Sequence, residues 1–156
     1  MKPIVSTTTV NRPRDEVFAF LDVLGNHEQF TDHFLVDWSL SGPATGVGAK
    51  ARMRTNMPGP ADWADMEVIE SVAPERIVER AVGGGGKRRT RGTYFLEPDG
   101  DGATRVRFEL VIEELPASAR LLAPLAGAWL RRGNDKAMRR LTELLETSDT
   151  PSPAAA

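Results

Sequence analysis

The sequence has no cysteine, only two histidines and a single tyrosine among its 156 residues. Without cysteine the chain has no disulfide framework, no thiolate metal site and no cysteine nucleophile. The histidines, His27 and His33, lie six residues apart, a spacing that does not align them for joint metal ligation on one helix. We therefore expect no metal and no cofactor. Both histidines are expected at the surface or at the rim of a site, with an acid or base role at the rim as the alternative.

The chain also lacks an excess of charge of one sign. Its 20 basic and 22 acidic residues give a formal net charge of -2, which provides no global attraction to nucleic acid or to an anionic membrane. The first residues, Met1-Lys2-Pro3-Ile4, lack the apolar stretch of a signal peptide. We expect a cytoplasmic protein, a monomer or homodimer, with no nucleic-acid partner and no stable membrane association.

Length and composition fit one globular domain. The chain is 40% hydrophobic and 27% charged, and its length supports a single core rather than two. We place this domain at residues 1–147. Residues 148–156 contain two prolines and nothing large to bury, which predicts a disordered tail without function.

The first part of the chain combines strand and short-helix patterns. Residues 4–10 alternate and are rich in β-branched side chains, which predicts a strand. Residues 13–24 place a proline and two acids at the start of an apolar helical stripe, and a second short helix is predicted around residues 26–34. Another strand follows at residues 35–40. We expect the two helices to interrupt a first hairpin.

From residue 47 the pattern becomes that of antiparallel strands joined by short turns. Strands are predicted within residues 47–56, 63–69, 76–82, 87–96 and 105–112. Many arginines lie on these strands, but acids are interleaved with them, so a solvated, salt-bridged face is favoured over a nucleic-acid surface. The run Gly83 to Gly86 lacks phosphate-loop spacing and a following helix, which predicts a hairpin tip.

One long amphipathic helix closes the sequence at Leu121 to Glu146, with a break predicted near Pro124. Its apolar stripe is thin in the middle, at Gly133 and Ala137. Small residues are also expected to point inward from the strands, namely Ala49, Ala51, Ala64 and Gly92. Small residues on both sides predict a cavity between sheet and helix, while the alternative is that large side chains fill the space.

Several local motifs occur in an order that resembles the START-related lipid-transfer and polyketide cyclase superfamily (SRPBCC). They are Thr7 to Val10 with Arg12 to Phe18, Asn26 to Phe30, Val47-Gly48, Val68 to Ile77, and Gly102 to Val106. Each motif is weak alone, but their order over residues 4–146 is specific for a fold rather than an activity. The resemblance implies an α+β helix-grip fold, in which a curved antiparallel sheet wraps around a long C-terminal helix and two short helices follow the first strand.

The resemblance also implies a deep pocket under the closing helix. A pocket lined by methionine and aromatic side chains suits an apolar or aromatic ligand, such as a lipid, polyketide or quinone-like molecule held by a carrier or sensor. The expected ligand-binding residues are Phe30, Phe34, Trp38, Met53, Met66, Tyr94, Phe108, Leu110, Trp129, Leu130 and Gly133.

Two polar residues are candidates for chemistry inside this pocket. Tyr94 shares a strand face with Gly92 and can orient a carbonyl or act as an acid, although an ordinary core tyrosine is the alternative. One of Glu79 and Arg80 should point inward, and an inward arginine would hold a ligand carboxylate or enolate unless it forms a structural ion pair. Tyr94 and Arg80 are therefore the catalytic candidates.

No nucleophile with an attached base is visible in the sequence, which disfavours a hydrolase. Two alternatives to a carrier or sensor remain open. One is an enzyme of the polyketide cyclase or dehydratase type, and the other is a macromolecule-binding module like the ribosome-associated members of the superfamily.

Overall fold

The computed structural model describes residues 2–147, and the expected tail at residues 148–156 lies outside them. Seven strands form one antiparallel sheet in the order β1-β7-β6-β5-β4-β3-β2. Their bounds are β1 Ile4–Val10, β2 Leu35–Ser41, β3 Lys50–Thr55, β4 Asp62–Val72, β5 Arg76–Gly83, β6 Arg88–Pro98 and β7 Thr104–Glu114. The helices are α1 Arg14–Leu21, η1 Leu24–His27, α2 Glu28–Thr31, α3 Ala117–Arg120 and α4 Ala123–Thr147.

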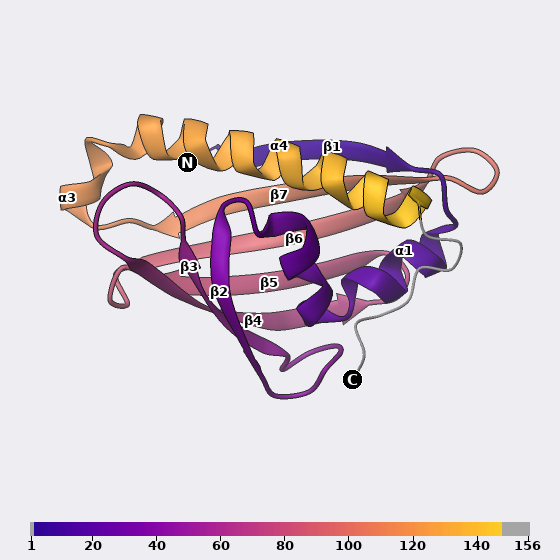
Figure 1. Ribbon diagram of the computed structural model, residues 1–156, viewed down its shortest axis with the longest axis horizontal. Coiled ribbons are helices and arrows are strands. Elements are labelled where there is room, and N and C mark those ends of the chain that lie inside the picture. Colours follow the sequence, from indigo (N-terminus) through magenta and orange to yellow (C-terminus); the bar gives the residue numbers. More distant parts are fainter. Residues whose placement is uncertain (1, 148–156) are drawn as a thin grey trace.

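The sheet curves along α4, as Figure 1 shows, so the predicted helix-grip architecture is confirmed. The short helices between β1 and β2 carry the chain from one edge of the sheet to the other. The expected first hairpin was therefore wrong, because β1 pairs with β7 and β2 pairs with β3. The helices span the sheet rather than interrupt a local pair of strands.

Register follows the alternation of the sequence. In the β3–β4 pair, Lys50 lies opposite Glu67 and Arg52 opposite Asp65. The Arg52 Nη1 atom lies 3.2 Å from Asp65 Oδ1, and both side chains are more than half exposed. Cross-strand charge pairs of this kind stabilise the solvent face only slightly. The predicted salt-bridged surface is confirmed here.

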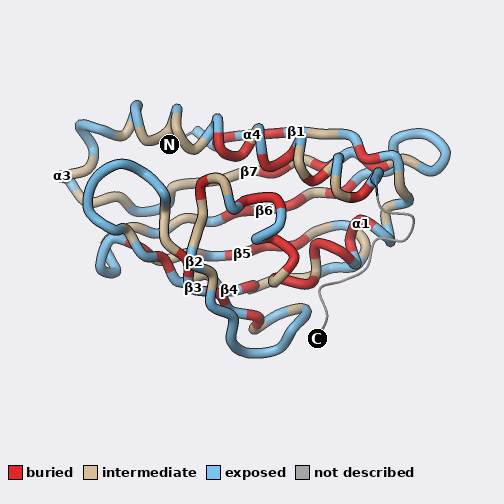
Figure 2. Tube along the Cα trace, in the orientation of Figure 1, coloured by how far each residue is buried: buried red, intermediate tan, exposed pale blue. Residues whose placement is uncertain are grey.

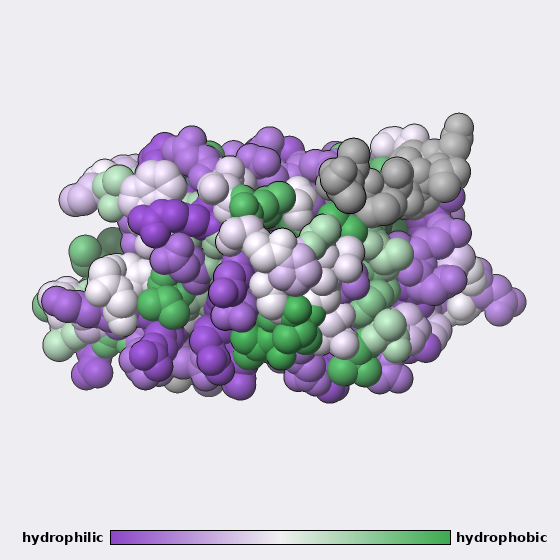
Figure 3. All heavy atoms as spheres, turned by 90° about the horizontal axis from the view of Figure 1, so that it is seen from below, coloured by the Kyte–Doolittle hydropathy of each residue, from purple (hydrophilic) through white to green (hydrophobic). Residues whose placement is uncertain are grey.

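Figure 3 shows one face of the molecule, turned by 90° about the horizontal axis from the view of Figure 1 so that it is seen from below. Hydrophilic groups cover much of this face and alternate with separate apolar ones.

The two halves of α4 have different environments. Every buried residue of α4 lies within residues 133–147, which we call its second half, and Figure 2 shows this half coloured as buried at intervals. This half is fastened to β1, where the Ser6 hydroxyl donates to Asp135 Oδ1 at 2.6 Å. The first half begins after the predicted break, with Pro124 in its first turn, and its inner residues are only half-buried. That half covers a space instead of a packed core.

Candidate functional site

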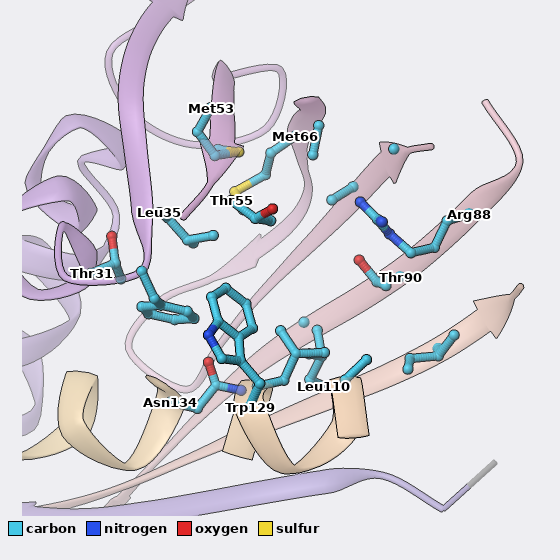
Figure 4. A pocket seen from close by; sticks show the side chains of 18 of the residues that line it. Thr31, Leu35, Met53, Thr55, Met66, Arg88, Thr90, Leu110, Trp129 and Asn134 are labelled. Atoms are coloured by element: carbon cyan, nitrogen blue, oxygen red, sulfur yellow. The ribbon is translucent and has the colours of Figure 1, made fainter. Parts of the chain in front are cut away.

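A cavity of about 330 Å³ lies between the inner face of the sheet and α4, which lines it from Ala123 to Met138. Strands β3 to β7 contribute its walls, and η1, α2 and the start of β2 contribute to its inner end. Figure 4 shows Trp129 of α4, Leu35 of β2 and Met66 of β4 approaching one another across this space. Of the small residues expected to leave this space, Ala64, Gly92 and Ala137 line the cavity, whereas Ala49 and Ala51 are buried in the core.

Most of the residues predicted to contact a ligand line this cavity. The aromatic ones are Phe34, Trp38, Tyr94, Phe108 and Trp129, and the aliphatic and thioether ones are Met53, Met66, Leu110 and Leu130. The rings contact one another around the cavity, for example Phe34 against Trp129, with centroids 5.7 Å apart and planes inclined by 66°. Edge-to-face contacts between rings stabilise such walls beyond their burial alone.

Phe30 and Gly133 do not line the cavity. Phe30 is fully buried in the core, where its ring packs against Phe20 and His27. Gly133 faces the Phe34 ring so closely that a Cβ atom would lie 2.5 Å from it. The predicted gap at Gly133 is therefore filled by an aromatic side chain of the α2–β2 connection, which sequence spacing on α4 does not reveal.

Of the pair Glu79 and Arg80, the structure places the glutamate inward. Strand alternation puts Glu79 on the face of Ile77, where it lines the cavity with only 4% of its surface exposed. Arg80 is exposed on the opposite face, where it lies in register with Glu67. The expectation that Arg80 reaches the pocket is therefore corrected, and Glu79 takes its place as a pocket residue.

His27 is buried at the inner end of the cavity, contrary to the expected surface or rim position. Its Nε2–H donates to the Leu21 carbonyl at 2.7 Å, which leaves Nδ1 of the neutral ring as an acceptor. This Nδ1 lies 3.6 Å from Glu79 Oε2. The turn from α1 through η1 folds His27 inward, so an acid and a base meet there although 52 residues separate them in the sequence.

The burial of this pair decides its charge. Burial raises the pKa of Glu79 to about 8. Burial also lowers the pKa of His27 to about 4, although the Leu21 hydrogen bond and the Asp22 carboxylate oppose that shift. Near neutral pH Glu79 is therefore a protonated carboxylic acid and His27 an uncharged imidazole. The contact between them joins two neutral groups rather than an ion pair.

Tyr94 stands beside this pair. Its ring meets that of His27 edge-on at 5.4 Å between centroids and that of Phe108 at 4.6 Å. Burial, and then the charge of Glu79, raise the pKa of Tyr94 well above its ordinary value, so its hydroxyl keeps its proton. Tyr94 thus shares the inner end of the cavity with Glu79, the member of the Glu79–Arg80 pair that points inward.

Asn134 is a second polar residue that sequence reasoning missed. It lines the cavity from α4 beside Trp129, as Figure 4 shows, and it is 6% exposed. Its Nδ2 atom is buried and has no hydrogen-bond partner within residues 2–147, and the same is true of Glu79 Oε2. The signal was present in the sequence, because an asparagine four residues after Leu130 interrupts an apolar helical stripe and has low helix propensity.

His33 lies outside the cavity and connects α2 to α4. Its Nε2–H donates to the Gly133 carbonyl at 2.9 Å, and its Nδ1 accepts from Arg140 Nη1 at 2.9 Å. The same Arg140 nitrogen donates to Asp32 Oδ1 at 2.6 Å. Burial is the main cause that lowers the pKa of His33. This network holds the second half of α4 in place and gives the neighbouring Asp32 and His33 a structural role.

The opposite end of the cavity is its mouth, between α3, the start of α4 and the β5–β6 turn. Arg88 lies there and donates two hydrogen bonds to Asp62, at 2.6 and 3.2 Å. Both side chains are about a quarter exposed. The neighbouring Leu122 also lines the cavity, and with Leu121 and Leu125 it forms an exposed apolar rim.

Within residues 2–147, no group of three or more histidine, cysteine, aspartate or glutamate side chains is placed to hold a metal ion. No helix among the same residues has the length and apolar character needed to cross a membrane. The polar residues that line the cavity include Glu79, Tyr94 and Asn134, the threonines Thr31, Thr55 and Thr90, and the Arg88–Asp62 ion pair.

Solved structures with the same fold confirm the architecture. TTHA0849 from Thermus thermophilus is 16% identical, with a TM-score of 0.72 over 95% of this chain and 99% of that chain. Norcoclaurine synthase from Thalictrum flavum is 16% identical, with a TM-score of 0.64 over 90% and 86%. DynU16, a protein of the dynemicin biosynthetic locus, is 24% identical, with a TM-score of 0.61 over 97% of this chain and 49% of that chain.

At these identities the solved structures show the fold alone. A sequence search of curated proteins finds no match. The model of one protein family, described as polyketide cyclase / dehydrase and lipid transport, matches residues 1–146. That match covers the whole sheet and nearly all of α4, the elements that build the cavity. The chain belongs to the polyketide cyclase / dehydrase and lipid transport family.

Proposed function

We propose that this protein binds an apolar, aromatic small molecule, such as a polyketide, a quinone or a lipid with a ring system, in the cavity under α4. The single observation that carries the proposal is an apolar cavity of about 330 Å³ walled by five aromatic rings. This volume is at the lower end of the range for small-molecule pockets, which favours a compact ligand of two or three fused rings. The protein acts as a carrier or sensor of that ligand.

The uneven burial of α4 supports this proposal. The second half of the helix is buried and hydrogen-bonded to β1, and it reaches the cavity only with Asn134, Ala137 and Met138. In the first half, the half-buried Ala126, Trp129 and Leu130 face the cavity. A helix anchored at one end can hold a cavity open without losing its place on the sheet. The cost of leaving apolar surface uncovered is offset when a ligand covers it.

The binding proposal is tested by filling the cavity from α4. Ala126 lines the cavity, whereas Ala128 lies two residues further along the same helix and is exposed. Ala126→Leu should weaken the binding of 2-ethylnaphthalene at least ten-fold by isothermal titration calorimetry, and Ala128→Leu should leave it unchanged. Native mass spectrometry of protein purified from its source organism should show a co-purified small molecule. Absence of both binding and a co-purified mass would refute the proposal.

A second candidate function is an enzyme of the polyketide cyclase or dehydratase type. The observation that favours it is the neutral carboxylic acid of Glu79 next to the phenol of Tyr94, inside a site largely closed to water. Such groups polarise a carbonyl and thereby acidify the neighbouring C–H bond. Norcoclaurine synthase is by its name an enzyme, and DynU16 comes from a biosynthetic locus, which is compatible with chemistry on this fold.

The enzyme candidate predicts that bound ketones exchange their α-hydrogens faster than free ones, with Glu79 or Tyr94 donating to the carbonyl oxygen and the Nδ1 lone pair of His27 accepting the α-proton. Incubation of the protein with 2-acetonaphthone in D2O, followed by NMR of the methyl group, measures this exchange. Tyr94→Phe separates the candidates, since lost exchange with retained binding supports an enzyme. No acceleration by the wild-type protein would leave the carrier or sensor function.

A further inference from the structure

We propose that the inner end of the cavity is a recognition site for neutral carbonyl oxygens, at which Glu79 and Asn134 donate hydrogen bonds to the ligand and from which carboxylates are excluded. This inference rests on the proposed function of the cavity and names the chemical class of its ligand. Ketones, aldehydes and quinones with an aromatic or fused-ring body fit this description.

The first observation is that two buried polar atoms have no partner. Glu79 Oε2 and Asn134 Nδ2 are both without a hydrogen bond in the part of the chain that the structure describes. Their residues are 4% and 6% exposed, and both line the same cavity. Native proteins rarely leave buried polar atoms unpaired, and such atoms mark places where a ligand or water supplies the partner.

The second observation is that both groups act as donors. An amide nitrogen such as Asn134 Nδ2 only donates. His27 has its Nε2–H committed to the Leu21 carbonyl, so its Nδ1 lone pair faces Glu79. An ionised Glu79 would place a second lone pair against it, whereas a protonated Glu79 carries an O–H. That O–H lies too far from Nδ1 for a good hydrogen bond, at 3.6 Å between heavy atoms, and is free for a ligand oxygen.

Backbone geometry makes room for this acid. Glu79 lies in register with Gly92 on the neighbouring strand β6. A Cβ atom at Gly92 would lie 2.9 Å from the Phe108 ring and 3.3 Å from Glu79 Oε1. Glycine therefore allows the carboxyl group and the ring to share one side of the sheet. Gly92 was expected to be a small inward residue, and the space it leaves accommodates the carboxyl group of Glu79.

The third observation concerns charge. Among the lining residues in the described chain the basic side chains are His27, which is uncharged near neutral pH, and Arg88 at the mouth. Arg88 is already paired with Asp62 through two hydrogen bonds. A ligand carboxylate at the inner end would thus be desolvated without a cation and would face the acid Glu79. Burial of an unpaired charge is costly, so anions are rejected while neutral acceptors are bound.

Three ligands with the same ring system test this proposal at pH 6.5 by isothermal titration calorimetry. They are 2-acetonaphthone, which carries a carbonyl, 2-ethylnaphthalene, which lacks one, and 2-naphthoate, which is anionic. Wild-type protein should bind the ketone at least ten-fold more tightly than the carboxylate. Glu79→Leu and Asn134→Leu should each weaken ketone binding at least five-fold, because each removes one donor, and should not weaken binding of the hydrocarbon.

Glu79→Gln is the conservative control, since its amide keeps a donor at the same place, and it should retain ketone binding within about two-fold. Circular dichroism shows whether each variant is folded, and the unchanged hydrocarbon affinity of the leucine variants serves as an internal check. The inference is overturned if the carboxylate binds as tightly as the ketone, or if the leucine variants weaken both neutral ligands equally. Failure of both neutral ligands to bind wild-type protein, together with the absence of a co-purified mass, would instead refute the proposed function.

Discussion

The two ends of the cavity each hold an acid–base pair, but the pairs differ in nearly every physical respect. At the mouth, Arg88 Nη1 lies 2.6 Å from Asp62 Oδ2, and the side chains are 26% and 28% exposed. At the inner end, His27 Nδ1 lies 3.6 Å from Glu79 Oε2, and the side chains are 2% and 5% exposed. The mouth carries a hydrated ion pair, whereas the inner end carries two neutral groups.

This difference shows that burial, rather than residue type, determines what an acid beside a base does. At the mouth, water and a guanidinium that never loses its proton keep both partners charged. At the inner end, the loss of hydration disfavours both ions, and their mutual attraction across 3.6 Å does not compensate. A molecule that enters the cavity therefore first passes an ion pair whose charges neutralise each other. It then reaches an inner end that carries neutral hydrogen-bonding groups.

The largest expected effect concerns the pH dependence of stability at the inner end. Glu79 has a pKa of about 8 in the folded protein, against 4.5 for an unperturbed side chain. Between these values the native state holds a proton that the unfolded state has lost, so stability falls as pH rises, by about 1 kcal/mol per pH unit. His27 acts oppositely between its pKa of about 4 and its ordinary value of 6.5. The two slopes cancel from pH 4.5 to 6.5, and stability should fall from pH 6.5 to 8.

Urea unfolding at several pH values, followed by tryptophan fluorescence, measures this profile. Glu79→Gln should remove the decline above pH 6.5 and reveal the rise with pH that His27 causes below it. His33 and the surface carboxylates contribute equally to both proteins, so their contributions cancel in the difference between the unfolding free energies of wild-type and variant. If this difference in unfolding free energy were constant from pH 4.5 to 8, Glu79 would be ionised in the folded protein over that range. The two ends of the cavity would then not differ in charge state.

Steric disruption of the inner end should have the next largest effect. Gly92→Ala introduces a Cβ atom that lies 2.9 Å from the Phe108 ring, so the ring or the strand must move. We expect a loss of about 1–3 kcal/mol of stability, as is usual for overpacking a core, together with weaker ligand binding. Thermal and urea unfolding measure the first effect and calorimetry the second.

Gly127→Ala is the matched control, because it lies on α4 and a Cβ atom there meets nothing within 4 Å. Alanine is the better helix former, so this variant should be stabilised by about 0.5–1 kcal/mol. If the two substitutions had equal effects, the close packing around Glu79 would not be needed for stability.

Breaking the ion pair at the mouth should have a smaller effect. Asp62→Asn removes the charge but keeps the shape, and partly exposed ion pairs contribute roughly 0–1 kcal/mol. The loss should shrink further in about 1 M salt, because screening already weakens the wild-type pair. Unfolding in low and high salt measures this, with Asp65→Asn in the exposed Arg52 pair as the control. A loss above about 2 kcal/mol that persists in high salt would contradict a hydrated mouth.

Alternation and turn signals in the sequence were sufficient to predict the strands, the break before α4 and the inward small residues. They also placed Tyr94 on the inner face together with Gly92. They could not choose between Glu79 and Arg80, because which of two adjacent charged residues is buried depends on which face of β5 lies toward α4. An isolated strand pattern looks the same for either choice.

The residues missed at the inner end depend on contacts between distant segments. His27 becomes buried because η1 folds against Glu79, and Gly133 is filled by Phe34 rather than by a ligand. The first hairpin was wrong for the same reason, since pairing of β1 with β7 joins segments far apart in the chain. Local periodicity specifies the face of an element but not its partner.

The smallest effect is expected for Tyr94→Phe, which asks whether the phenol belongs to the polar inner end. Tyr94 is 3% exposed, and no hydrogen bond joins its hydroxyl to another residue within the described chain. The Tyr94 hydroxyl has no partner within the described chain, so its removal leaves no other polar group without a hydrogen bond. The free energy of unfolding should therefore change by less than about 0.5 kcal/mol. Ketone affinity should likewise change less than about two-fold, because the donors in our proposal are Glu79 and Asn134. A larger loss of ketone affinity with unchanged hydrocarbon affinity would show that Tyr94 also belongs to the recognition site. It would also favour the enzyme candidate, because Tyr94 would then be a second acid beside Glu79 that polarises the ligand carbonyl.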